Sequence, residues 1–314
     1  MEQIREVMPS DFTVFDVAFP AEARQRVIVN TDAKNEADDQ YAIVHAVLTP
    51  SFELHGIIPA HYGTRKTPTS LRESHDETVK LLCLMDLEGQ VRIEDGAPRA
   101  IPDESTPADS PGARLIIDEA MKDDKRPLHV AFYGPLTDMA SALLLEPAIQ
   151  DRAIRVIWIG GNSWPSGGSE YNLSNDIHAA NIVMKSRVEV WQIPTSTYRT
   201  MGVTYAELIE KVHPQGEIGR YLVDQLIEHN AKRRHAMEYR SLGDSPCIGI
   251  ILDPECGQWS WRPAPIFDTQ MRYLHTGQYR PIRVYESVNT RFVHEDFFAK
   301  LAQFIRRGSR NLDR

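Results

Sequence analysis

Cysteine is scarce in this sequence of 314 residues, which contains only Cys83, Cys247 and Cys256. An odd and sparse set does not build a disulfide framework, and none of the three stands in the Cys-x-x-Cys or Cys/His spacing of zinc sites. We therefore expect a cytoplasmic protein, kept in a reducing compartment, whose cysteines pack as small apolar side chains.

Long apolar runs and an excess of positive charge are missing as well. No run approaches the roughly 20 apolar residues of a membrane-spanning helix, and residues 1–19 lack the basic start and apolar stretch of a signal peptide. Lys and Arg number 35 against 44 Asp and Glu, which gives a formal net charge of −9. This charge disfavours membrane and nucleic-acid partners, and it is compatible with a small neutral ligand such as a sugar or nucleoside.

Strand-like and helix-like segments alternate through the first two thirds of the chain. Strands are predicted at 26–30, 52–61, 128–134, 154–161 and 188–194, and helices at 37–48, 70–85, 113–122 and from 136 onward. Residues 94–111, rich in Pro, Asp and Ser, predict a long loop. The alternation predicts an α/β fold with a mostly parallel central sheet, open and Rossmann-like, flanked by helices on both faces.

The last third of the chain shows a different pattern. It predicts one long helix over 205–234, a terminal hairpin from the strand-like segments 272–277 and 281–287, and an amphipathic closing helix over 294–307. Residues 1–24 precede the first strand as an N-terminal extension. We expect a single domain over residues 25–314.

An acidic loop directly follows the first predicted strand. It contains four carboxylates within eight residues: Asp32, Glu36, Asp38 and Asp39. Ligands of open α/β sheets bind at the carboxyl ends of strands, and like charges gathered there favour a bound cation such as Ca²⁺, which prefers oxygen ligands. Alternatively, Asp38 and Asp39 simply cap a helix N-terminus. The loop alone leaves both interpretations open.

Four segments together resemble the inosine–uridine-preferring nucleoside hydrolases. The acidic loop is similar to the Asp-x-Asp-Pro-Gly-x-Asp-Asp motif of that family. The segment YGPLTDMASALLLEP, residues 133–147, resembles its Gly-x-Leu-Thr-Asn helix start. GGN…SEYNLSNDIHAA (160–180) and GDSPCIGIILDP (243–254) resemble its Glu-Phe-Asn-x-x-x-Asp-Pro-Glu-Ala-Ala and His-Asp-x₈-Asp-Pro segments. The matches occur in the family's order, over about residues 27–254.

The resemblance implies a nucleoside hydrolase fold and a metal site. Asp32 is expected to bind Ca²⁺ and to act as general base on its water. Asp39, the backbone carbonyl of Tyr133 and Asp244 are expected to complete the protein ligands of the ion.

The resemblance also implies a set of sugar-binding residues. Asp38 is expected to contact a sugar hydroxyl and, together with Asp32, to be catalytic. Asp244 is expected to bind the substrate as well as the metal ion. Glu170 and Asn172 are expected to hold the ribose, and Asn162 stands for a family Asn in the loop before them.

The sequence departs from the family pattern at several points. Asn30 stands where the motif has its first Asp, Ala33 and Lys34 replace Pro-Gly, and Asn35 and Glu36 are extra. Gly243 replaces the His that many members use as leaving-group acid, and the loop from Gly161 to Glu170 is shorter than the family's. The loop pattern Asn-Thr-Asp-x-x-Asn-Glu-x-Asp-Asp is similar to that of a divergent branch of the family. Some members of this branch are associated with carbohydrate metabolism.

The identity of the residue that activates the leaving base therefore stays open. Trp164, Trp259 and Trp261 are candidates for stacking on a base, and His61, His229 and His235 are candidate acids. Each is more often a packing or surface residue. The segment 233–241, with His235, Glu238 and Arg240, either lines the pocket or, as we expect, forms a solvated helix face.

Three functions remain in competition. The first, which we favour, is a Ca²⁺-dependent hydrolase that cleaves the N-glycosidic bond of ribonucleosides to ribose and free base. The second is a hydrolase of another glycoside, a furanoside or modified nucleoside, and the third is a non-catalytic sugar- or nucleoside-binding protein. In each case we expect a small-molecule partner and a homo-oligomer, either dimer or tetramer.

Overall fold

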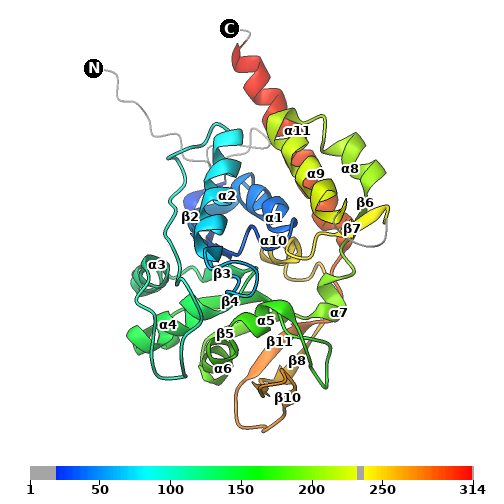
Figure 1. Cartoon of the computed structure of the whole chain (residues 1–314). Coiled ribbons are helices and arrows are strands. Elements are labelled where there is room, and N and C mark those ends of the chain that lie inside the picture. Colours follow the sequence, from blue (N-terminus) through cyan, green and yellow to red (C-terminus); the bar gives the residue numbers. More distant parts are fainter. Residues whose placement is uncertain (1–18, 232–236, 313–314) are drawn as a thin grey trace, which may run out of the picture.

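The computed structural model describes residues 19–231 and 237–312 (Figure 1). Seven strands form the central sheet in the order β2 (Phe52–Pro59), β1 (Gln25–Thr31), β3 (Leu128–Phe132), β4 (Ile154–Ile159), β5 (Glu189–Ile193), β11 (Pro281–Tyr285) and β8 (Trp259–Pro263). Pairing is parallel from β2 to β11, and only the edge strand β8 runs antiparallel to its neighbour. The predicted α/β fold with a mostly parallel sheet is confirmed.

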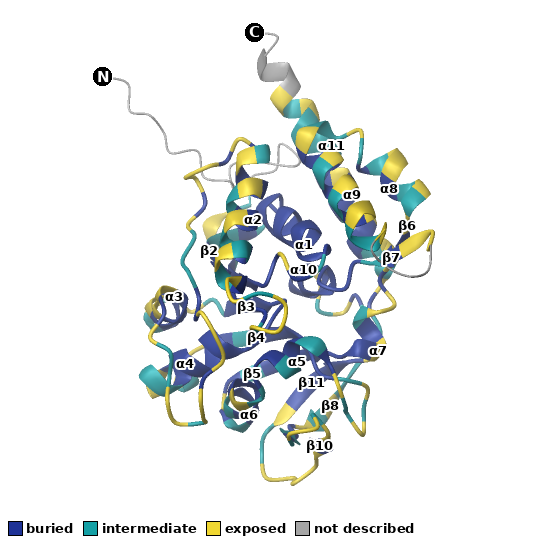
Figure 2. Ribbon diagram, in the orientation of Figure 1, coloured by how far each residue is buried: buried dark blue, intermediate teal, exposed yellow. Residues whose placement is uncertain are grey.

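Helices cover both faces of this sheet, because apolar side chains alternate along its buried strands. Val27 and Val29 of β1 join one hydrophobic core, whereas Ile28 joins the other. The first core contains α1 (Asp39–Val47), α2 (Ser70–Leu84), α8 (Tyr205–Lys211), α9 (Gly216–Ala231), α10 (Pro246–Leu252) and α11 (Thr290–Leu312). The second contains α3 (Pro111–Met121), α4 (Thr137–Leu145), α5 (Tyr171–Asn175) and α6 (Ile177–Lys185). Figure 2 shows α1 buried along its whole length and α10 buried up to its last residue, Leu252, whereas α2 and α9 are partly exposed.

Two predictions for the last third are wrong. The long helix is two helices, α8 and α9, because Pro214 cannot continue a helix and Gly216 adopts a positive φ of 65°. The terminal hairpin does not form. Instead β10 (Tyr273–Leu274) pairs with β9 (Ile266–Phe267), and β11 inserts between β5 and β8. The sequence analysis did not predict the partner strand β8, an edge strand of five residues whose side chains are all at least partly exposed.

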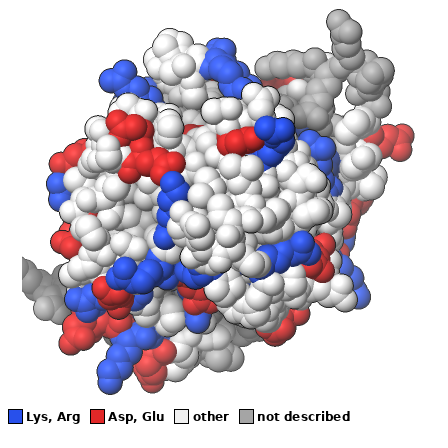
Figure 3. All heavy atoms as spheres, turned by 90° about the horizontal axis from the view of Figure 1, so that it is seen from below, with Lys and Arg blue, Asp and Glu red and all other residues white. Residues whose placement is uncertain are grey.

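Shorter elements complete the fold. They are η2 (Ala21–Ala23), η3 (Pro147–Asp151), α7 (Thr195–Tyr198), β6 (Gly202–Thr204) and β7 (Tyr239–Ser241). Among the described residues, no helix has both the length and the apolar character that crossing a bilayer requires. On the underside of the molecule, seen in Figure 3, Lys and Arg side chains lie among Asp and Glu side chains. The division into an extension (1–24) and one domain (25–314) stays a prediction.

A buried amide–carboxylate pair fastens β1 to α4. Asn30 Nδ2 donates to Asp138 Oδ2 at 2.9 Å, and Asp138 Oδ1 accepts from the Ala97 N–H and the Ser110 hydroxyl. Asn30 and Asp138 stand where the motifs that the sequence resembles have Asp and Asn. The two departures are therefore complementary, because the amide at position 30 donates to the carboxylate at position 138.

Replacing Asn30 by Asp tests this pairing. Asn30→Asp sets two carboxyl groups against each other in the core, and we expect it to lower the free energy of unfolding by about 3 kcal/mol. The double variant Asn30→Asp/Asp138→Asn restores a donor and an acceptor, so most of the loss should be recovered in urea denaturation. Equal destabilisation of the single and double variants would contradict the pairing.

Candidate functional site

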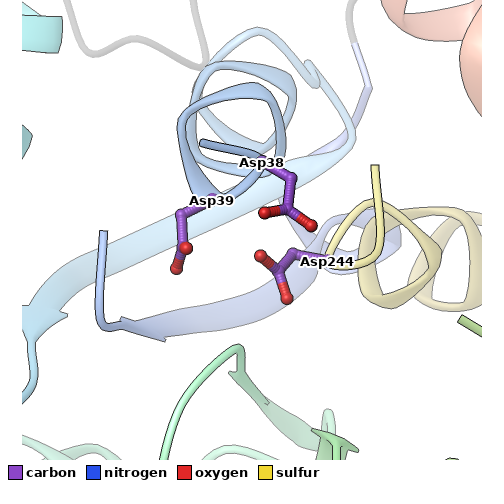
Figure 4. Close-up of side chains that lie close together, drawn as sticks. All are labelled: Asp38, Asp39 and Asp244. Atoms are coloured by element: carbon purple, nitrogen blue, oxygen red, sulfur yellow. The ribbon is translucent and has the colours of Figure 1, made fainter. Parts of the chain in front are cut away.

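The acidic loop lies at the carboxyl edge of the sheet, between β1 and α1. Asp32 follows β1, while Asp38 and Asp39 begin α1. Asp244 comes from the turn before α10, more than 200 residues further along the chain. Carboxylate oxygens of Asp38, Asp39 and Asp244 lie within 4.8 Å of one another, and Figure 4 shows the three side chains facing a common space. This triad contains Asp38, which the sequence analysis assigned to the sugar, and not Asp32.

Nearly all the predicted site residues line one cavity of about 70 Å³, called the inner cavity below. Its lining includes Asp32, Asp38, Asp39, Tyr133, Glu170, Asn172 and Asp244. The parallel order of β1, β3 and β4 explains this convergence, since their carboxyl ends meet at one edge. Asn162 is not among the lining residues. Its amide is used within its own loop, donating to the Ser169 carbonyl at 2.7 Å and accepting from the Ser163 N–H at 2.7 Å.

The hydrogen bonds of Asp38 test whether its side chain caps a helix. It stands at the N-cap of α1 but makes no side-chain capping bond. Its Oδ2 instead accepts the N–H of Gly243 at 2.8 Å, and its Oδ1 lies 3.7 Å from the Arg240 guanidinium. The capping interpretation is therefore wrong for Asp38, because its carboxylate turns away from the helix and into the cavity wall.

Asp39 and Asp32 are two further carboxylates of this loop. Asp39 Oδ1 accepts the Thr31 hydroxyl at 2.6 Å. Asp32 Oδ2 is buried without a hydrogen-bond partner among the described residues. A buried carboxylate oxygen left without a donor is costly unless a proton or a cation compensates it.

Burial and mutual repulsion raise the pKa values of these acids. Burial, followed by the charge of Asp38, raises the pKa of Asp39 to about 8. Burial, followed by the charge of Glu36, raises the pKa of Asp38 to about 6. Burial and then the charge of Asp39 raise the pKa values of Asp32 and Asp244 as well. All these donors are oxygens, so the cavity fits a hard cation of the Ca²⁺ type.

The predicted ribose-holding residues also hold the protein together. Both oxygens of the Glu170 carboxylate accept hydrogen bonds from the chain, among them the N–H groups of Gly161 and Leu173, each at 2.9 Å. Asn172 Nδ2 donates to the carbonyls of Tyr133, at 2.7 Å, and Ile159, at 2.9 Å. Asn172 thus orients the same carbonyl of Tyr133 that is predicted to bind the ion.

None of the described candidates for leaving-group activation lines the cavity. Trp164 donates to Gln192 at 3.0 Å, and Trp259 and Trp261 lie on the edge strand β8. His61 is buried against the Thr137 hydroxyl at 2.9 Å, and burial lowers its pKa to about 4. His229 lies in the last turn of α9, and His235 is outside the described residues.

A larger outer cavity, of about 510 Å³, adjoins the inner one. Six residues line both: Glu36, Asp38, Glu170, Tyr171, Tyr198 and Gly243. Its remaining wall includes Arg65, Arg199, Met237, Tyr239 and Arg240. From the sequence, Glu36 was counted among the acids of the loop and as an insertion, but it was given no role in the site. Tyr198 was not identified, since it lies in α7, a segment without a motif.

Arg240 corrects a prediction for the segment before Asp244. Arg240 does not lie on a solvated helix face but in β7, which pairs with β6, and it is 6% exposed. Its guanidinium hydrogen-bonds the Glu36 carboxylate. Burial acts to lower the pKa of Arg240, but the charges of Asp38 and Glu36 raise it above its ordinary value. The side chain is therefore a cation in the cavity wall.

Gly243 lies close to two neighbouring side chains. A Cβ atom there would approach Asp38 Oδ2 and Tyr198 Cδ2, each to 3.2 Å. The glycine thus permits the close bond between its own N–H and Asp38. A side chain at this position would require Asp38 or Tyr198 to move.

Comparisons with known proteins agree with the four motifs. Residues 27–295 match the family model of the inosine-uridine preferring nucleoside hydrolases. The chain is 22% identical over 254 residues to the pyrimidine-specific ribonucleoside hydrolase RihA of Salmonella typhimurium, which covers 73% of this chain and 80% of that protein.

Solved structures show the same fold. A purine-preferring ribonucleoside hydrolase from Gardnerella vaginalis superposes with a TM-score of 0.74 at 19% identity, over 90% of this chain and 99% of that one. A plant nucleoside hydrolase superposes with a TM-score of 0.70 at 18% identity, over 88% of this chain and 99% of that one.

The raised pKa values predict how the stability of the metal-free protein depends on pH. Between the ordinary Asp value of 3.8 and the folded values of about 6 and 8, the folded chain holds more protons than the unfolded chain. Raising the pH through this window therefore destabilises the fold. After EGTA treatment, we expect a lower Tm at about pH 8 than at about pH 5, with Ca²⁺ raising the Tm more at the higher pH. A Tm that responds neither to pH nor to Ca²⁺ would contradict the cation site.

Proposed function

This chain belongs to the inosine-uridine preferring nucleoside hydrolase family, and we propose that it is a Ca²⁺-dependent hydrolase of ribonucleosides that releases ribose and free base. Family membership identifies it as a hydrolase of N-glycosidic bonds. The calcium ion, the ribose products and the roles of individual residues belong to the proposal.

One observation carries the proposal: seven of the predicted site residues, all buried, line a single cavity at the carboxyl edge of the sheet. Asp32, Asp39, Asp244 and the carbonyl of Tyr133 would hold the ion, with Asp38 close beside them. When bound, a Ca²⁺ ion lowers the pKa of a water molecule and orients sugar hydroxyls.

In this proposal Asp32 acts as the general base. Its Oδ2 is buried and has no described hydrogen-bond partner, so it is available to accept a proton from the attacking water. As the water oxygen bonds to C1′ of the sugar, the C1′–N bond breaks and its electron pair stays with the base. The carboxylates of Asp38 and Asp244 accept hydrogen bonds from the sugar hydroxyls and stabilise the positive charge that develops on the ring.

A second candidate substrate is a modified nucleoside or another furanoside. Gly243 in place of the family His favours it, as does the absence of any described His from the lining of either cavity. The names of the similar proteins do not indicate which base this chain would accept, since one is named pyrimidine-specific and another purine-preferring. A reducing-sugar screen on nucleosides and on non-nucleoside furanosides separates the two candidates.

Turnover and the role of Asp32 can be tested together. We expect ribose release from at least one member of a panel of purine and pyrimidine nucleosides, and a loss of about 10³-fold or more in kcat for Asp32→Asn. The matched control is Asp76→Asn, an exposed acid of α2 with 57% of its side chain accessible. No release from the whole panel with Ca²⁺ present would refute nucleoside hydrolysis.

Metal removal gives a separate test. EGTA should abolish turnover, and added Ca²⁺ should restore it, because the proposed chemistry needs the cation for both the water and the sugar. Full activity after exhaustive chelation would contradict the calcium requirement. The expected homo-oligomer and cytoplasmic location stay predictions, the first of which sedimentation equilibrium can check.

A further inference from the structure

The sizes of the two cavities indicate where the sugar and the base of a nucleoside would lie. The inner cavity, about 70 Å³, is lined by the four Asp residues and Tyr133, whereas the outer one is about 510 Å³. If the sugar meets the inner carboxylates, the leaving group must extend into the outer cavity, which alone has the space. Asp38 and Glu170 line both and so mark the junction at which the bond to be cleaved would lie.

Arg240 lies at this junction. It lines the outer cavity beside Gly243 and lies 3.7 Å from Asp38. Its side chain is only 7% exposed, and its Nε is buried without a hydrogen-bond partner among the described residues. Its one hydrogen bond to a described residue runs from Nη2 to Glu36. The guanidinium therefore has donor capacity that the described protein does not use.

No other described group in the lining offers the same chemistry at that place. Arg65 and Arg199 are exposed at the cavity wall, and Arg65 already donates to Ser174 at 2.7 Å. The hydroxyl of Tyr198 donates to the Glu170 carboxylate at 3.1 Å. Position 243, from which many family members present a His, has no side chain.

We propose that Arg240 is the leaving-group residue of this enzyme, donating hydrogen bonds from its guanidinium to the departing base. The inference rests on the proposed N-glycosidic hydrolysis. As the C1′–N bond breaks, its electron pair passes to the base nitrogen, and the positive charge of Arg240 stabilises the anion that forms. The guanidinium keeps its protons because it is far too weak an acid to give one up. The water proton goes to Asp32, and the released base anion takes its proton from solvent.

This role selects a class of substrate. A leaving group stabilised by hydrogen bonds alone must be able to carry negative charge, or must offer an acceptor atom beside the glycosidic nitrogen for a planar donor. Oxo-purines and oxo-pyrimidines meet this requirement. An aglycone that already leaves readily as an anion, such as 4-nitrophenolate, needs the guanidinium least.

The test compares two substrates within one variant, so that any loss of folded protein cancels in the ratio. We expect Arg240→Met to lower kcat/KM for the best nucleoside about 10²- to 10³-fold, but that for 4-nitrophenyl β-D-ribofuranoside by no more than roughly tenfold. Arg240→Lys keeps the positive charge but loses the planar set of N–H donors. Its kcat/KM for the nucleoside should therefore lie between those of wild type and Arg240→Met. Arg72→Met, at an exposed arginine of α2 whose side chain is 73% accessible, is the matched control.

The outcomes separate the two proposals. If Arg240 only neutralises Glu36 and Asp38, both substrates should lose activity by the same factor, and the leaving-group role is overturned. Unchanged nucleoside turnover in Arg240→Met also overturns it, while leaving nucleoside hydrolysis intact. A wild-type enzyme that cleaves neither substrate refutes nucleoside hydrolysis, and the leaving-group role with it.

Discussion

Repulsion among buried carboxylates is the constraint around which this site is built. Asp32, Asp38, Asp39 and Asp244 all line one small cavity, where burial and their neighbours raise the pKa of each. The protein itself offsets only part of this repulsion. Such a site is stable when a cation or protons complete it, which links the fold of this edge to the chemistry we propose for it.

The partial compensation comes from segments far apart in the chain. Asp38 is held by the N–H of Gly243 and faces the charge of Arg240, both on the segment that leads into α10. Asp39 is held by Thr31, at the end of β1. The inserted Glu36 pairs with Arg240 and so brings the lengthened loop against β7. The inserted Glu36 and Gly243, which stands in place of the family His, both line the outer cavity. Both departures from the family therefore alter the wall of this cavity.

Several polar residues serve structure and the proposed function together. Glu170 caps α5 and Asn172 ties the ends of β3 and β4, so the predicted ribose-holding groups are fixed before any ligand arrives. Asn30 and Asp138, each a departure from its motif, form a hydrogen bond with each other. Two departures from the motifs thus complement each other within the core of this protein.

The sequence by itself determined the α/β fold, the strands that lead into the site, and the family. Those properties are encoded locally, in the β-branched strands, in the helical spacing between them, and in four ordered motifs that include Asp32, Glu170 and Asp244. Only the tertiary structure decided that Asp38 turns to Gly243 instead of capping α1, that β11 pairs with β5 and β8, and that Asn162 bonds within its own loop. It also decided that Arg240 is buried beside the acids. These outcomes depend on contacts between segments up to about 200 residues apart, which no local pattern of apolar and polar residues specifies.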